Sequence, residues 1–166
     1  MRPFKLLGLT LLGFALTQPF PLDKELNAQT KKRPTARVFI LAGQSNMQGH
    51  AVVDLDHPEY YNGGKGILTT VMRSSENELR MSHLLNPDGS WRVRDDAFCW
   101  YRTDDELKAG GISFGFAAYG GKPHHFGPEM QFGHVVGDAF NDPILIIKTA
   151  WGGKSLMTDF RPPSSG

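Results

Sequence analysis

The sequence has little of several features that define common classes of protein. It contains one cysteine, Cys99, so no disulfide can form within the chain and a zinc site built on several cysteines is excluded. Charge of either sign is not in excess, since 18 Lys and Arg face 17 Asp and Glu. The chain therefore lacks the basic character that nucleic-acid-binding domains need.

Long apolar runs are also scarce, and the mean hydropathy is −0.32. This value excludes a polytopic membrane protein, while 40% hydrophobic against 21% charged residues excludes a disordered polyampholyte. The length of 166 residues suits one domain with a substantial core. The 19 glycines and 11 prolines predict many loops.

The N-terminus has the pattern of an export signal. Arg2 and Lys5 precede an apolar run over residues 6–16, which is too short to span a bilayer but suits the core of a signal peptide. We expect residues 1–28 to be the signal, 29–36 a linker, and the protein to be periplasmic or secreted. A buried N-terminal helix is the alternative. Small residues mark two candidate cleavage sites, after Ala15 and after Ala28.

Two continuous apolar runs predict buried parallel strands. Residues 37–42 end at Gly43, and residues 143–150 end at a Trp-Gly-Gly turn; such runs suit strands that are covered on both faces. Residues 129–140 between them have a loosely helical apolar pattern that begins after Pro128. Strand, helix and strand in this order predict a right-handed crossover and the α/β class.

Residues 50–122 have a different character from the two runs. They are weakly periodic and rich in Gly, Asp, Asn and Tyr, and we interpret them as an insertion after the first strand of a domain spanning 37–166. Ligands bind at the carboxyl ends of strands in open α/β sheets, which is where this insertion begins. Short strands are predicted within it at residues 89–93, 98–101 and 112–119.

One motif follows the first strand directly and carries the candidate chemistry. Residues 43–47 read Gly-Gln-Ser-Asn-Met, which places Ser45 on a tight turn from a strand into a helix. Backbone N–H groups at a helix N-terminus can stabilise the negative charge that develops when a serine attacks a carbonyl. The motif is not the Gly-x-Ser-x-Gly elbow of α/β-hydrolases. On local features alone, the favoured interpretation of Ser45 is the N-cap of a helix in a strand-to-helix turn.

Three blocks resemble a known family. Residues 38–49 resemble the first block of the SGNH (GDSL-like) hydrolases in the form typical of the sialate O-acetylesterase-like group, carbohydrate esterase family six. Residues 126–133 and 147–156 resemble later blocks in the family's order. The resemblance implies a three-layer α/β/α flavodoxin-like SGNH hydrolase fold. The blocks read Val-Phe-Ile-Leu-Ala-Gly-Gln-Ser-Asn-Met-Gln-Gly, Phe-Gly-Pro-Glu-Met-Gln-Phe-Gly and Ile-Lys-Thr-Ala-Trp-Gly-Gly-Lys-Ser-Leu.

The resemblance also implies roles for single residues. Ser45 matches the nucleophile, and its own N–H matches one donor of the oxyanion hole. Gly153 matches the glycine whose N–H is the second donor, with Gly152 as the alternative if the register differs by one. Three further residues of these blocks are candidates for shaping the site, and the last is alternatively a helix cap: Gln44, Asn46 and Glu129.

Two blocks of the family have no counterpart in these 166 residues. The family supplies a further oxyanion-hole side chain from a Gly-Glu-x-Asp-like block, and the base with its orienting acid from an Asp-x-x-His block. No histidine follows Trp151, and Asp159 is the one acid there. A serine needs such a base near neutral pH. We therefore expect an N-terminal fragment whose C-terminal strands and helices are missing, with the base beyond Gly166.

The remaining histidines offer weaker alternatives. His50 lies five residues after Ser45 and is a substitute base to be weighed. His124, His125 and His134 flank the second block, but adjacent side chains of an extended segment point apart and do not favour a metal site. The Gly-Gly-Lys-Ser run after the second strand is not a phosphate-binding loop, because Lys148 occupies the position of a required glycine.

The function that the sequence predicts is that of a serine esterase. It would remove O-acetyl groups from carbohydrate, as sialate O-acetylesterases and acetylxylan esterases do, through an acetyl-enzyme, and would be inactive as this fragment. No metal or organic cofactor is implied; the partner is an acetylated carbohydrate, without nucleic acid or a membrane span after signal removal. The alternative is a non-catalytic carbohydrate-binding protein derived from such an esterase. Its candidate stacking residues are Tyr60, Tyr61, Trp91, Trp100 and Tyr101.

Overall fold

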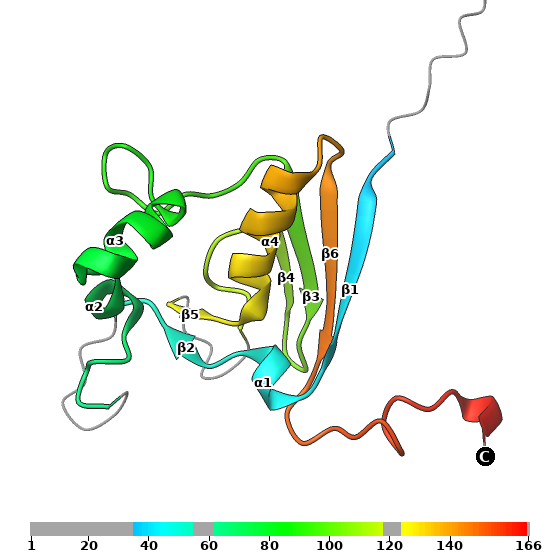
Figure 1. Cartoon of the computed structure of the whole chain (residues 1–166). Helices are drawn as coiled ribbons and strands as arrows, with labels where there is room; N and C mark the ends of the chain where they lie inside the picture. Colours follow the sequence, from blue (N-terminus) through cyan, green and yellow to red (C-terminus); the bar gives the residue numbers. More distant parts are fainter. Residues whose placement is uncertain (1–34, 55–61, 118–123, 166) are drawn as a thin grey trace, which may run out of the picture. The chain divides into compact units, whose positions relative to one another are not determined.

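The computed structural model describes residues 35–54, 62–117 and 124–165, all of which belong to the unit Pro34–Gly166. The predicted signal peptide at residues 1–28 lies outside these ranges. The described residues form a mixed α/β fold in which a four-stranded sheet packs on one face against a helix (Figure 1).

The main sheet has the strand order β1-β6-β3-β4. The apolar runs found in the sequence form its two neighbouring strands β1 (Arg37–Gly43) and β6 (Ile144–Ala150), which are parallel. Helix α4 (Pro128–Ala139) immediately precedes β6 along the chain, with Pro128 in its first turn. The two predicted parallel strands and the helix before the second are therefore confirmed, while β3 and β4 of the same sheet also lie between β1 and α4 in the sequence.

Strands β3 (Ala97–Arg102) and β4 (Leu107–Gly111) complete the sheet. β3 is parallel to β6, while β4 is antiparallel to β3. The predicted strand at residues 98–101 is confirmed as part of β3. Both strands come from residues 50–122, so this stretch extends the main sheet.

Alternation along β6 shows which face of the sheet is covered. Ile144, Ile146, Lys148 and Ala150 are buried toward α4, and the residues between them are partly exposed. On the face of the sheet away from α4, apolar side chains are exposed: Val38 of β1 to 52% and Ile40 of β1 to 67%, and Trp100 of β3 to 41%. Among the described residues, the expectation of strands covered on both faces is therefore met on the side of α4 alone. The core between α4 and the sheet contains Val136 of α4 together with Ala97, Cys99, Tyr101, Ile112 and Phe116.

A smaller set of elements flanks the sheet. β2 (Ala51–Val52) pairs antiparallel with β5 (His125–Phe126). Three short elements follow β2 along the chain: helices α2 (Leu68–Met72) and α3 (Ser75–Met81) and the 3₁₀ turn η1 (Ser82–Leu84). A second hydrophobic cluster includes residues of these elements and of α4. A last 3₁₀ turn, η3 (Pro163–Ser165), lies near the C-terminus. The second cluster contains Val53, Leu68, Leu84 and Met130.

Two predicted short strands are wrong. Residues 89–93 contain one isolated bridge, from Leu85 to Trp91, because Asn86, Asp88 and Ser90 close a turn with their side chains instead. Residues 112–117 follow the end of β4 at Gly111 without continuing the strand. Residues 118–119 lie outside the described ranges.

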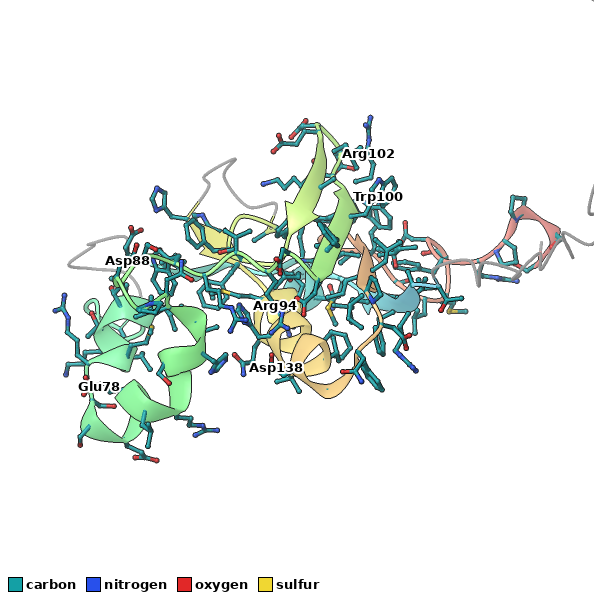
Figure 2. All side chains as sticks on the ribbon, turned by 90° about the horizontal axis from the view of Figure 1, so that it is seen from above. Glu78, Asp88, Arg94, Trp100, Arg102 and Asp138 are labelled. Atoms are coloured by element: carbon teal, nitrogen blue, oxygen red, sulfur yellow. The ribbon has the colours of Figure 1, made fainter. Side chains whose placement is uncertain are left out.

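Arg94 fastens α4 to the segment before β3. Its guanidinium is 2% exposed and donates from Nε and Nη2 to the two carboxylate oxygens of Asp96, each at 2.7 Å, and from Nη1 to Asp138 Oδ1 at 2.5 Å (Figure 2). A further bond reaches the carbonyl of His134 at 3.2 Å. The guanidinium holds the pKa of both carboxyl groups below their usual range. Within the described residues, no helix has the length and apolar character that crossing a membrane requires.

Candidate active site

Ser45 is the first residue of α1 (Ser45–Gln48), a single helical turn that begins directly after β1. The N-cap position is taken by Gln44, so the reading of Ser45 as an N-cap is wrong. Two backbone bonds close the turn: Gln48 N donates to Gln44 O at 2.8 Å, and Gly49 N donates to Ser45 O at 3.0 Å. Ser45 is half-buried and stands at the carboxyl end of a parallel strand, where open α/β sheets bind ligands.

The loop after β6 lies at the same edge of the sheet. β1 and β6 are parallel with Gly43 opposite Ala150, and the N–H of Trp151 donates to Gly43 O at 3.4 Å. The indole of Trp151 donates to the carbonyl of Arg102 at 3.1 Å, which ties this loop to β3 as well. The sheet therefore brings the Ser45 turn and the Gly152–Gly153 loop together at one edge.

Gly153 has a left-handed backbone with φ +72°, a conformation that favours glycine. Both Gly152 and Gly153 are exposed, and open space surrounds the position of a Gly153 Cβ. The loop is thus accessible at the edge where the Ser45 turn begins. Gln44 and Asn46, which flank the serine, are exposed as well.

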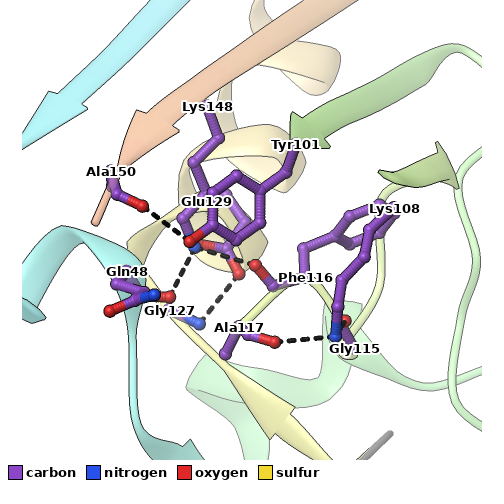
Figure 3. A network of polar contacts seen from close by, with 10 residues as sticks. All are labelled: Gln48, Tyr101, Lys108, Gly115, Phe116, Ala117, Gly127, Glu129, Lys148 and Ala150. Atoms are coloured by element: carbon purple, nitrogen blue, oxygen red, sulfur yellow. Dashed lines mark hydrogen bonds and ion pairs between the residues drawn. The ribbon is translucent and has the colours of Figure 1, made fainter. Parts of the chain in front are cut away.

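Glu129 and Lys148 form a fully buried ion pair behind α1 (Figure 3). Glu129 Oε2 lies 2.6 Å from Lys148 Nζ, and Glu129 Oε1 accepts a bond from the N–H of Gly127 at 2.8 Å. Lys148 Nζ also donates to the carbonyls of Gln48 at 2.7 Å and Phe116 at 2.9 Å. Burial lowers the pKa of Lys148, and the Glu129 carboxylate acts in the opposite direction.

Sequence reasoning missed the role of Lys148, which it considered only as a departure from a phosphate-binding loop. A signal was present, because a lysine inside an apolar strand is buried only when it has a carboxylate and further acceptors. Glu129, which was singled out, is that carboxylate. It lies in the first turn of α4 and contacts the residue that precedes this helix.

The described histidines are engaged with other groups than Ser45. The ring of His50 stacks on that of His125 with centroids 5.3 Å apart, and His124 Nδ1 lies 2.7 Å from Asp54 Oδ1. His83 pairs with Gln131, and His134 is buried on α4. Among the described residues none of these contacts is with Ser45, and no group of three His, Cys, Asp or Glu side chains could hold a metal.

The described aromatic residues among the stacking candidates do not gather into one sugar-stacking surface. Tyr101 is fully buried and donates its hydroxyl to the carbonyl of Ala150 at 2.6 Å, so it cannot stack on a ligand. Trp91 packs edge-to-face on Phe114 in the second cluster. Trp100 is exposed on β3, on the sheet face away from α4 (Figure 2). Tyr60 and Tyr61 lie outside the described residues.

These features define an α/β protein with a serine on the turn at the carboxyl edge of its sheet. A family model described as carbohydrate esterase, sialic acid-specific acetylesterase, matches residues 35–165. The chain therefore belongs to this family of carbohydrate esterases. No curated protein and no solved structure matches the chain.

Proposed function

We propose that the protein is a serine esterase that removes O-acetyl groups from carbohydrate, with Ser45 as its nucleophile. The observation that carries this proposal is the position of Ser45. It is the first residue of α1, it follows a parallel strand directly, and it lies inside the range that the esterase family matches. A serine there has its hydroxyl at the sheet edge and its own N–H at a helix start, where negative charge is stabilised.

The reaction would proceed in two steps. The Ser45 hydroxyl attacks the acetyl carbonyl carbon while a base takes its proton, and the oxyanion is stabilised by the N–H groups of Ser45 and Gly153, or of Gly152 in its place. The sugar oxygen leaves with that proton, which produces an acetyl-enzyme. The base then takes a proton from water, whose oxygen attacks the acetyl carbonyl carbon; the bond to the Ser45 oxygen breaks, acetate leaves, and the proton returns to the serine. The proposal assigns the base and its orienting acid to residues outside the described ranges.

We also propose the finer features that belong to such an enzyme. The fold would be the three-layer α/β/α type, with a second helical layer over the sheet face that bears Val38 and Ile40. Support comes from the coverage of one face by α4 and the apolar character of the other. Export through residues 1–28 is proposed from the sequence pattern.

The test is Ser45→Ala in the native-length protein, assayed by acetate release from O-acetylated sialic acid and from acetylated xylan. Activity should disappear while the melting temperature stays within a few degrees of wild type, because Ser45 is half-buried and its side chain is small. Ser75→Ala, an exposed serine at the start of α3, is the matched control and should keep full activity. Retained activity in Ser45→Ala would refute the proposal.

A second measurement tests where the base is found. The intact mass of the protein purified from its source is compared with 18.4 kDa, the mass of these 166 residues. A larger mass directs the search for the base to the added sequence. If the mass matches, with or without removal of a signal, and acetate release is absent, the esterase proposal is abandoned in favour of carbohydrate binding.

A further inference from the structure

Lys148 is placed on β6, but its side chain ends under α1. The ammonium donates to three acceptors, namely the carbonyl of Gln48, the carbonyl of Phe116 and the carboxylate of Glu129, at 2.6–2.9 Å (Figure 3). An ammonium has three donor hydrogens, so its capacity is fully used. One of the acceptors, Gln48, is the last residue of the turn that begins with Ser45.

A turn as short as α1 needs support from outside. Isolated helices of a few residues are unstable, and the last carbonyls of any helix have no partner within it. The two backbone bonds that close α1 are donated by the N–H groups of Gln48 and Gly49, so they leave the Gln48 carbonyl without a partner inside the turn. The Lys148 ammonium supplies the missing partner at this end, as a charge-assisted bond with the sign that a helix C-terminus favours.

Glu129 connects Lys148 to Gly127, the residue that contacts the end of the α1 turn at Gly49. Its second oxygen accepts the N–H of Gly127 at 2.8 Å, and Gly127 lies against the backbone of Gly49, where a Cβ on Gly49 would stand 2.3 Å from the Gly127 Cα. The carboxylate thus holds Lys148 below the turn and Gly127 beside it. Both ends of the pair are 0% exposed, so neither can touch a substrate.

We infer that Lys148, held by Glu129, is a positioning residue that fixes the conformation of the Ser45 turn. Buried ion pairs are often no more stabilising than apolar residues of the same size, so stability alone does not account for this one. The bond from Lys148 to the Gln48 carbonyl gives this buried pair a role, because that bond sets the orientation of the backbone that carries the Ser45 hydroxyl and N–H. The catalytic consequence rests on the proposed function, whereas the conformational claim does not.

The experiment compares Lys148→Met with the double variant Lys148→Met/Glu129→Leu, both made in the native-length protein. Hydrogen exchange of the Gln48 and Gly49 amides is measured by NMR, with amides of β3 and β4 as internal references. In the single variant we expect a lower melting temperature, because a carboxylate is left buried without its partner. The two amides should exchange about tenfold faster or more relative to the reference strands, since the end of α1 has lost its bond.

The double variant separates positioning from general stability. It should recover most of the lost melting temperature, while the Gln48 and Gly49 amides stay fast and the kcat for acetate release stays at least about tenfold below wild type with KM little changed. If amide protection returns together with the melting temperature, Lys148 serves stability alone and the inference is overturned. Unchanged exchange in both variants overturns it as well.

The same experiment keeps the two proposals apart. Failure of the esterase proposal is seen as full activity in Ser45→Ala, and it leaves the exchange result to decide whether Lys148 fixes the turn. Failure of the positioning inference is seen as recovered amide protection in a protein whose activity still depends on Ser45. A single variant too unstable to study does not block the decision, because the double variant carries the same loss of the bond to Gln48.

Discussion

Gly49 and Gly127 are in backbone contact, at a distance that leaves no room for a side chain on either. A Cβ on Gly49 would lie 2.3 Å from the Cα of Gly127, and one on Gly127 would lie 3.0 Å from the Cα of Gly49. Gly49 also has φ +86°, a left-handed conformation that ends α1. This contact joins the turn that carries Ser45 to the start of α4.

The first prediction follows from that contact. Gly49→Ala should reduce the free energy of unfolding by about 2–4 kcal/mol, because a left-handed alanine is strained and its Cβ meets backbone that must shift. The change is measured by urea denaturation followed by circular dichroism. Gly89→Ala is the matched control, since Gly89 has φ +82° with nothing within 4 Å of its Cβ position.

The control should lose only about 1–2 kcal/mol, which is the cost of the left-handed conformation alone. Equal losses in the two variants would show that the Gly49–Gly127 contact yields without cost. If Gly49→Ala loses stability but its Gln48 amide stays protected from exchange, the backbone at Gly127 has shifted to accommodate the new Cβ and the α1 turn has kept its conformation.

Local patterns predicted the parts of this fold that local physics decides. The apolar runs at residues 37–42 and 143–150 form β1 and β6, and the helix between them begins at Pro128 as its sequence indicates. The position of Ser45 on a turn after β1 was available from its five-residue motif. Each of these features depends on neighbours within a few positions of the chain.

Features that depend on distant partners were not predictable in the same way. Lys148 and Glu129 are 19 positions apart and Arg94 and Asp138 are 44 apart, so no spacing rule connects them. Residues 89–93 alternate as a strand does, but side chains in the preceding turn take up the available hydrogen bonds. Which element covers a sheet face is likewise decided by packing. Alternation in the sequence predicts which face of a strand is buried, but not what packs against it.

A second prediction concerns the clamp that Arg94 forms between α4 and Asp96. Arg94→Met should cost about 2–3 kcal/mol of unfolding free energy, because the two-pronged bond to Asp96 and the bond to Asp138 are lost together. The estimate lies below that for fully buried pairs, since both carboxylates are about half exposed and regain water. Arg94→Lys should recover only part of the loss, because one ammonium cannot match the planar fork.

Arg37→Met is the matched control for the clamp. Arg37 also pairs with a carboxylate at 2.7 Å, that of Asp142, but both side chains are more than 40% exposed. Exposed pairs contribute little, so this variant should lose less than about 1 kcal/mol. Thermal melts of the three variants decide the matter, and a loss in Arg37→Met as large as in Arg94→Met would refute the role of burial.

The last prediction concerns His134, which is fully buried on α4. Among the described residues, neither ring nitrogen of His134 has a hydrogen-bond partner. Burial lowers its pKa from the ordinary 6.5 to about 4, and the nearby charges of His83, Arg94 and Arg92 act in the same direction against the opposing Asp138. As the pH falls, the unfolded chain therefore binds a proton before the folded one does.

The free energy of unfolding should consequently decrease as the pH falls from 6.5 to 4. The difference between pH 7.5 and pH 5 amounts to about 2 kcal/mol for this histidine. Urea midpoints at the two pH values measure it in wild type and in His134→Leu, where the loss should be smaller by that amount. If His134→Leu keeps the full wild-type difference, another group is responsible for the acid sensitivity, and His134 binds protons equally in the folded and unfolded chains over this range.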